Sequence, residues 1–183
     1  MTKVIIKDIL QAVELLQQGE ILGYPTEAVF GLGVDASQPE AIKKLRNLKN
    51  RSSKGLIIIA DRWECIQPWV GTLSDNQINQ MLESWPGPYT WIVPASPLAP
   101  KTLQGEDGTL AVRIPDHTLC QQLCKHLDHP IVSTSANPKG MPPAKTTSEF
   151  INYFEEVHVL DGKVGNQSKP STIKDIRTGK VLR

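Results

Sequence analysis

The sequence predicts an α/β fold, and three observations support this. Its 183 residues are enough for one hydrophobic core of ordinary size and few for two, so we expect residues 1–183 to form a single domain. Stretches with apolar residues at helical spacing alternate with short apolar runs of strand length. Residues 55–60, Gly-Leu-Ile-Ile-Ile-Ala, are an unbroken apolar run typical of a central strand covered on both faces.

Each predicted helix begins at a side chain that can cap it. The expected capping residues are Asp8, Ser37 with Glu40, Ser74 with Gln77, and Asp116. The helix after Asp8 should end near Gly19. In the helix after Ser37, we expect the apolar residues to face inward: Ala41, Ile42, Leu45 and Leu48. A short helix is predicted over residues 148–154.

The predicted strands are short and lie between these helices. A strand of about five residues should end at Tyr24. Further strands are expected at residues 55–60, 89–95, 109–114, 130–134 and 157–160, with a terminal hairpin over residues 171–183. Trp85 and Trp91 are interpreted as core residues.

Residues 21–36 are predicted to leave a strand and enter a loop. Pro25 favours an extended Tyr24, so the Thr26 and Glu27 side chains should be held rigidly just past the strand end and reach solvent. Gly31 and Gly33 in that loop would allow close approach of backbone or ligand. The pattern fits a ligand-binding loop and also a plain turn.

Charge is distributed unevenly along the chain. The formal net charge of +1 argues against a strongly basic binder of polyanions. Residues 43–54, however, contain six cations and no acid, which indicates either a local phosphate-attracting face or a solvated helix surface. Arg113 lies in an apolar strand and needs an anionic partner, which is either a protein carboxylate or a substrate carboxylate.

Cysteine use and hydropathy indicate the cellular environment. Three cysteines fit reduced core thiols better than disulfides, although Cys120 and Cys124 near His126 and His129 leave a zinc site open. We interpret the four histidines, His117, His126, His129 and His158, as structural. No window approaches the ~18 apolar residues of a membrane span, and a secretory signal is absent, so a cytoplasmic protein without membrane contact is expected.

The strand at 130–134 runs into a cluster of polar side chains. Ser133-Thr134-Ser135-Ala136-Asn137 offers hydroxyl and amide groups at one strand end, which suits a polyoxyanion site and also a Ser/Thr-rich turn. The Walker A, Gly-x-Ser-x-Gly, His-Glu-x-x-His and dinucleotide-loop patterns are absent. Common nucleotide and hydrolase folds are therefore disfavoured.

Seven motifs in this order resemble one known family, from about residue 8 to the C-terminus. They occupy residues 24–33, 49–51, 54–57, 85–88, 111–113, 133–137 and 170–173. Together they are similar to the YrdC/TsaC family of threonylcarbamoyl-AMP synthases. The resemblance implies a twisted, open, mixed sheet flanked by helices, with a basic concave cavity.

The resemblance also implies an activity. Such an enzyme makes L-threonylcarbamoyl-AMP and pyrophosphate from ATP, bicarbonate and L-threonine, with Mg²⁺ entering as the ATP complex and no tightly bound cofactor or separate metal site. The product serves threonylcarbamoyladenosine modification of tRNA next to the anticodon. The implied macromolecular partners are a tRNA-modifying threonylcarbamoyl transferase complex and, weakly, tRNA.

Site residues follow from the same resemblance. Those implied for the chemistry are Lys49, Arg51, Ser135 and Asn137. Those implied for threonine are Thr26, Arg113 on the carboxylate, and Ser171. Those implied for ATP are Arg51, Lys54, Thr109, Ser133, Ser135 and Arg183.

Two departures from the family pattern bear on these assignments. Ser52 stands where the family usually has proline, and the spacing from Arg51 to Lys54 is one residue shorter, so the role of Lys54 is left open. The chain reaches Arg183 without the additional C-terminal domain of longer members, and we expect a more open cavity.

Two other functions remain as alternatives. One is an RNA-binding or ribosome-maturation module that uses the same basic face. The other is a carbamoyl-phosphate-using enzyme or a domain of one, although the acylphosphatase and zinc-finger segments that accompany such domains are absent from the sequence.

Overall fold

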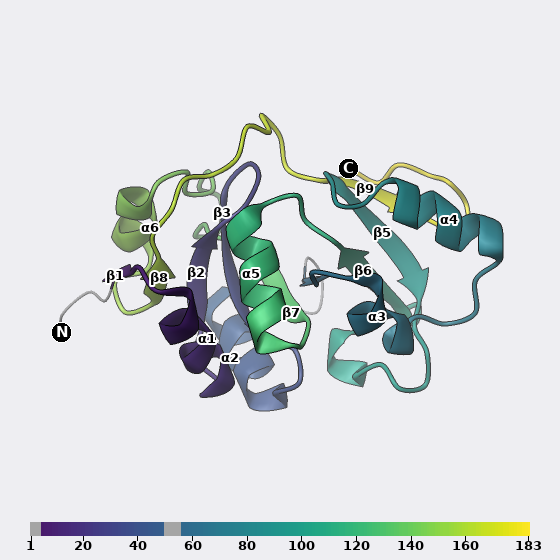
Figure 1. The fold of residues 1–183 in the computed structure, drawn as a ribbon, viewed down its shortest axis with the longest axis horizontal. Helices are drawn as coiled ribbons and strands as arrows, with labels where there is room; N and C mark the ends of the chain where they lie inside the picture. Colours follow the sequence, from purple (N-terminus) through teal and green to yellow (C-terminus); the bar gives the residue numbers. More distant parts are fainter. Residues whose placement is uncertain (1–4, 50–55) are drawn as a thin grey trace.

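The computed structural model describes residues 5–49 and 56–183, and within them nine strands form one mixed sheet (Figure 1). The strands are β1 (Ile5–Ile6), β2 (Leu22–Pro25), β3 (Phe30–Asp35), β4 (Ile57–Ile59), β5 (Tyr89–Pro94), β6 (Thr109–Arg113), β7 (Ile131–Ser135), β8 (His158–Leu160) and β9 (Thr172–Asp175). Their order is β1-β8-β2-β3-β7-β4-β6-β5-β9, and the sheet does not close on itself. The expected open mixed sheet is therefore confirmed.

The helices cover the sheet from both sides and build two hydrophobic clusters. They are α1 (Ile9–Gln17), α2 (Pro39–Lys49), α3 (Trp63–Ile66), α4 (Asp75–Glu83), α5 (Thr118–Leu127) and α6 (Thr147–Tyr153). Helices α1 and α5 contribute to one cluster, and α2, α3, α4 and α6 contribute to the other. Figure 1 shows α1 and α5 in front of the sheet and the fainter α2 behind it. Within the described residues no helix is long and apolar enough to cross a membrane.

Two of the predicted helix caps are confirmed. Asp8 accepts a hydrogen bond from the Leu10 amide (3.0 Å) at the start of α1. Ser74 and Gln77 form a reciprocal capping box at the start of α4. The starts of α1 and α4 therefore agree with the prediction, because a cap can be predicted from nearby residues where no other partner competes for the capping side chain.

The other two caps are wrong, and so is one inward-facing residue. Ser37 donates its hydroxyl proton to Asp35 Oδ1 (2.7 Å) before α2 begins at Pro39, so this carboxylate displaces the capping interaction. Asp116 precedes the true N-cap of α5, His117, and its backbone amide binds Glu27 instead. Leu48, in the last turn of α2, is 39% exposed although it lies on the same side of the helix as the buried Ala41 and Leu45.

The loop expected around Gly31 and Gly33 is instead strand β3. It pairs antiparallel with β2, with Gly33 opposite Leu22 and Gly31 opposite Tyr24, and only four residues, 26–29, connect the two strands. A Cβ at Gly33 would lie 2.8 Å from the Tyr24 ring. The glycines therefore make room for a neighbouring aromatic side chain inside a sheet, and the sequence pattern was wrongly interpreted as a loop.

The remaining strands agree closely with the sequence. The predicted central strand is β4, which pairs with β7 and β6, while Trp85 and Trp91 are buried. The terminal hairpin is confirmed by the antiparallel bridge between Lys174 and Val181. Strand β1 was not expected, since two residues are too short to give a period-2 pattern.

The register of the central strands determines where the site lies. Ile57 is opposite Ser133, and Ile59 is opposite Arg113, so these side chains share one face of the sheet. The intervening residues Ile58 and Val112 are buried in the core on the other face. Helices α1 and α5 pack on the first face around β2 and β7, and farther along the sheet the same face lines a cavity.

Candidate active site

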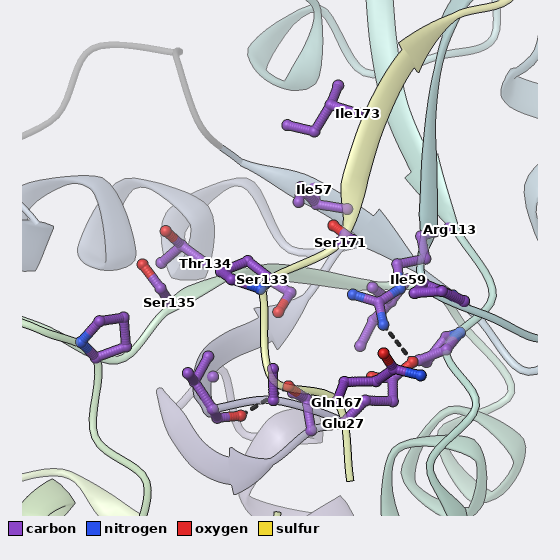
Figure 2. A pocket seen from close by; sticks show the side chains of 18 of the residues that line it. Glu27, Ile57, Ile59, Arg113, Ser133, Thr134, Ser135, Gln167, Ser171 and Ile173 are labelled. Carbon is purple, nitrogen blue, oxygen red and sulfur yellow. Dashed lines mark hydrogen bonds and ion pairs between the residues drawn. The ribbon is translucent and has the colours of Figure 1, made fainter. Parts of the chain in front are cut away.

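A cavity of about 320 Å³ lies on the face of the sheet formed by β4, β6 and β7 (Figure 2). Its walls come from three parts of the chain: the β2–β3 turn, the polar end of β7, and the segment that connects β8 to β9. We call this last segment, residues 161–171, the strap. Figure 1 shows it passing across one end of the sheet from β8 to β9. The cavity thus joins residues from the beginning, middle and end of the chain.

The β2–β3 turn forms the first wall. Thr26 donates its hydroxyl proton to the carbonyl of Val29 (2.7 Å), so the Thr26 oxygen faces a ligand as an acceptor. Glu27 is only 4% exposed, and the expectation that it reaches solvent is wrong. The turn is folded inward because the Glu27 carboxylate binds partners inside the protein.

Those partners are Arg113 and a backbone amide. Glu27 Oε1 accepts hydrogen bonds from Arg113 and from the Asp116 amide, the latter at 2.7 Å, and Arg113 Nε donates to the Gly87 carbonyl (3.2 Å). Figure 2 shows this ion pair at the cavity wall. The other oxygen, Glu27 Oε2, is buried without a described partner. Arg113 therefore has the protein carboxylate that its burial requires, and it also lines the cavity.

The end of β7 forms the second wall. Three consecutive residues line the cavity here, Ser133, Thr134 and Ser135 (Figure 2). Tyr24 donates a hydrogen bond to Ser133 Oγ (2.6 Å), and Ser135 donates one to Asn137 Oδ1 (2.7 Å). Ser133 and Ser135 are two positions apart in β7 and share one face, so two ordered hydroxyl groups lie at a ligand-sized cavity.

Lys49 binds the backbone at this end of β7. It lies at the end of α2, is buried, and its ammonium donates to the carbonyl of Ser135 (2.8 Å), to the carbonyl of Asn137 and to Asn137 Oδ1 (3.2 Å). Arg51 and Lys54, implied for chemistry and ATP, lie outside the described residues. The structure thus brings Lys49, Ser135 and Asn137 together.

The strap forms the third wall and is bonded to the first. Gly165 N–H donates to the Thr26 carbonyl (2.9 Å), and Gln167 N–H donates to the Glu27 carbonyl (3.1 Å). A Cβ at Gly165 would lie 3.0 Å from Glu27 Cα, so glycine permits this close approach. At the end of the strap, the Ser171 hydroxyl is 2.8 Å from the Thr90 hydroxyl.

Cations outnumber carboxylates among the described residues that line the cavity. Arg113, Lys169 and Arg183 are positive, and Glu27 is the one carboxylate. Partial burial lowers the pKa of Arg183, and repulsion by Arg113 lowers it further. Because an anionic ligand would relieve this repulsion, the arrangement favours anion binding.

Most of the implied site residues converge on this cavity. Those that line it are Thr26, Arg113, Ser171, Ser133, Ser135 and Arg183. Lys49 and Asn137 lie directly behind Ser135. Thr109 does not line it: its hydroxyl donates to Asp107 Oδ1 (2.6 Å) at the opposite end of β6 from Arg113. Two further residues, Glu27 and Tyr24, were not assigned from sequence, since their roles depend on partners far along the chain.

The cysteines of α5 belong to the core. Cys120 and Cys124 are buried, their thiols donate to the carbonyls of Pro25 (3.2 Å) and Ile59 (3.8 Å), and burial raises the pKa of both. No group of three potential metal ligands occurs in the described part of the chain. His117 Nε2 is 3.0 Å from the Lys163 carbonyl, which is a structural contact.

The fold and this cavity define an open-sheet α/β protein with a candidate ligand site lined by cations and hydroxyl groups. A family model described as "Telomere recombination", the Sua5/YciO/YrdC model, matches residues 14–183. The chain belongs to the Sua5/YciO/YrdC family.

Its relatives in sequence cover nearly the whole chain. A threonylcarbamoyl-AMP synthase of Vibrio campbellii is 43% identical over 182 residues, which is 97% of this chain and 98% of the relative. A protein of the same name from Yersinia enterocolitica is 46% identical over 182 residues, covering 97% of this chain and 94% of the relative. The correspondence therefore includes every cavity wall.

Solved structures share the fold. A crystal structure of P. abyssi Sua5 complexed with L-threonine superposes with a TM-score of 0.90 at 25% identity, over 100% of this chain and 57% of that chain. This chain thus spans little more than half of P. abyssi Sua5. E. coli YciO superposes with a TM-score of 0.84 at 22% identity, over 99% of this chain and 93% of that chain, which shows the fold alone.

Proposed function

We propose that this protein is an L-threonylcarbamoyladenylate synthase, which forms L-threonylcarbamoyl-AMP and pyrophosphate from ATP, bicarbonate and L-threonine. One observation carries the proposal: the three residues implied for threonine and three of the six implied for ATP line the same cavity. Relatives at 43–46% identity carry the name of this enzyme. The structure of P. abyssi Sua5 complexed with L-threonine has the same fold.

Arg113, Thr26 and Ser171 would hold the threonine. The guanidinium suits the α-carboxylate, because its planar donors match two carboxylate oxygens. Glu27 fixes the orientation of that guanidinium before the substrate arrives. Thr26 Oγ1, which already donates to Val29, can accept a hydrogen bond from the substrate ammonium or hydroxyl. This orients the amine toward the β7 hydroxyls.

Ser133, Ser135 and Arg183 would hold the phosphates. The amine adds to bicarbonate with loss of water, or to carbon dioxide with loss of a proton; a carbamate oxygen then attacks the α-phosphorus in line and pyrophosphate leaves. The Ser133 hydroxyl proton and the cations would stabilise the added negative charge of that transition state without covalent catalysis. Lys49 and Asn137 keep Ser135 in place, and Arg51 is a further candidate for phosphate contact.

Magnesium would enter as the ATP complex. Glu27, the one carboxylate among the described lining residues, has an oxygen occupied by Arg113 and Asp116. The ion's ligands would therefore come mainly from phosphate oxygens and water, as is usual for Mg²⁺ with nucleotides. The product would pass to a tRNA-modifying threonylcarbamoyl transferase complex in the cytoplasm.

The deciding experiment is pyrophosphate release by the purified protein. We expect release only when ATP, Mg²⁺, bicarbonate and L-threonine are all present. Omission of each component in turn is the control, and release that persists without threonine would refute the proposal. An RNA-binding module would instead bind RNA tightly with strong salt dependence, form no adenylate, and tolerate Asn137→Ala.

A further inference from the structure

A buried tyrosine lies directly behind one hydroxyl of the cavity. Tyr24 has no exposed surface, and its phenol donates a hydrogen bond to Ser133 Oγ at 2.6 Å, across 109 residues of sequence. Ser133 in turn lines the cavity (Figure 2). A polar side chain buried this completely adds little to the core that phenylalanine would not, so its hydroxyl calls for a separate explanation.

The chain makes specific room for this tyrosine. A Cβ at Gly33 would lie 2.8 Å from the Tyr24 ring and its oxygen, and one at Gly31 would lie 3.3 Å from the ring and 3.4 Å from Ser133 Oγ. Both glycines stand in β3, where glycine weakens a strand. The two glycines thus leave space for the Tyr24 ring beside Ser133, and Gly33 leaves space for Ile131 as well.

The direction of the hydrogen bond determines what Ser133 can do. A serine hydroxyl has one proton to donate and lone pairs that accept. Because Ser133 Oγ accepts from Tyr24, its own proton is available to another group. Among the residues that the structure describes, none accepts a hydrogen bond from Ser133. The proton is therefore left for a ligand in the cavity.

Tyr24 also remains a donor over a wide pH range. Burial raises the pKa of its phenol well above the ordinary value, and the nearby Cys120 raises it further, outweighing the hydrogen bond to Ser133. A raised pKa favours the protonated phenol, which is the form that can donate. The arrangement is consequently a fixed donor behind Ser133.

We propose that Tyr24 is a positioning residue: its hydrogen bond commits the Ser133 hydroxyl to donate into the cavity, toward an acceptor such as a phosphate oxygen of the nucleotide. This rests on the proposed function, in which Ser133 contacts ATP. Hydrogen bonds in such a chain polarise one another, so the phenol also strengthens the donor that the ligand meets.

A second buried hydroxyl pair provides a matched comparison. Thr90 is fully buried, and its hydroxyl is 2.8 Å from that of Ser171, which lines the opposite wall and is implied for threonine. Either hydroxyl of this pair can be the donor. Removing the Thr90 hydroxyl should therefore affect threonine and spare ATP, whereas removing the Tyr24 hydroxyl should do the reverse.

The test measures binding of Mg·ATP and of L-threonine separately, by calorimetry, to wild type, Tyr24→Phe, Ser133→Ala and the double variant. We expect Tyr24→Phe to weaken Mg·ATP binding about three- to tenfold, the usual range for one hydrogen bond, and to leave threonine binding within about twofold. The double variant should bind Mg·ATP no more weakly than Ser133→Ala alone. Thr90→Val should weaken binding of L-threonine and leave binding of Mg·ATP unchanged.

A stability control separates this role from general core damage. Cys124→Ala alters the same hydrophobic cluster as Tyr24 without contacting Ser133, so it should lower Tm and leave Mg·ATP binding unchanged. Wild-type affinity in Tyr24→Phe, or additive losses in the double variant, would overturn the inference alone. Wild-type protein that binds neither Mg·ATP nor threonine would overturn the proposed function as well.

Discussion

Glu27 and Arg113 form a buried ion pair at the cavity wall although 86 residues separate them in sequence. The side chains are 5% and 12% exposed, respectively. Each therefore depends on the other to offset the cost of burying a charge. The pair joins the β2–β3 turn to the end of β6, so one interaction both closes the cavity wall and orients the cation inside it.

Removing both partners should destabilise the protein by less than the sum of the two single removals. We expect Glu27→Ala and Arg113→Ala each to lower the free energy of unfolding by about 3 kcal/mol, because a buried charge is left without its partner. The double variant should lose clearly less than the sum. Urea denaturation of the four proteins measures this, and simple additivity would show that the two charges do not interact.

Thr26 gives a prediction that separates hydroxyl chemistry from side-chain shape. We expect Thr26→Ala to raise the KM for L-threonine about three- to tenfold, because the substrate loses one acceptor, and to leave the KM for ATP unchanged. Thr26→Ser keeps the oxygen and its hydrogen bond to Val29, so its kinetics should match the wild type. Equal KM values for threonine in all three proteins would remove Thr26 from the threonine site.

Lys49 and Asn137 should behave as one unit. Lys49→Met leaves the acceptors of Ser135 and Asn137 without their shared donor, and we expect kcat to fall about a hundredfold as Ser135 is misplaced. Asn137→Ala should lower kcat by a similar factor. The kcat of the double variant should be no lower than that of the less active single variant.

Another lysine of α2 provides the control for this pair. Lys44 is exposed and contacts Gly19 and Glu20, so Lys44→Met should retain wild-type kcat. Steady-state kinetics at saturating substrates measure all four variants. A normal kcat in Lys49→Met would contradict the role assigned to this lysine.

The turn after β9 should contribute stability that depends on pH. Asp175 accepts hydrogen bonds from the Arg177 backbone and guanidinium, and chiefly this hydrogen bonding lowers its pKa. A carboxyl whose native pKa is lowered stabilises the fold above its unfolded pKa of about 3.9 and loses that contribution as the pH falls through the native value.

Asp175→Asn tests this dependence. We expect it to cost up to about 1 kcal/mol at neutral pH, since Arg177 is partly exposed, and the difference from wild type should shrink as the pH falls below the unfolded pKa of about 3.9. Denaturation curves at several pH values measure it, with the exposed Glu156→Gln as the control. A difference that persists unchanged in acid would mean that Asp175 acts through packing rather than charge.

Much of the fold could be predicted because its signals are local. The caps at Asp8 and Ser74 and the apolar run of β4 each depend on residues a few positions apart. Predictions failed where a distant partner intervened. Ser37 binds Asp35 instead of capping α2, and Gly33 makes room for the Tyr24 ring inside a sheet. A periodicity argument does not contain such contacts.

The candidate site was predictable through motifs and not through geometry. The motifs indicated Ser135 and Arg113, and the structure shows both at one cavity. Glu27 stood beside Thr26 in the same motif, yet only the fold shows that it is buried against Arg113. Thr109 was implied for ATP but lies at the end of β6 away from the cavity, because a position in the sequence does not tell which end of a strand reaches the cavity.

The strap has a consequence for the order in which the molecule assembles. It forms the third wall of the cavity, and it ends in β9, the last named strand of the sheet, which pairs with β5 and, through one bridge from Lys174 to Val181, with the C-terminal segment. Contacts between residues so distant in sequence form late in folding. Edge elements are also the first to open locally. Detachment of β9 and the strap would thus expose the cavity while the two hydrophobic clusters stay packed. Bound ligand would oppose that opening.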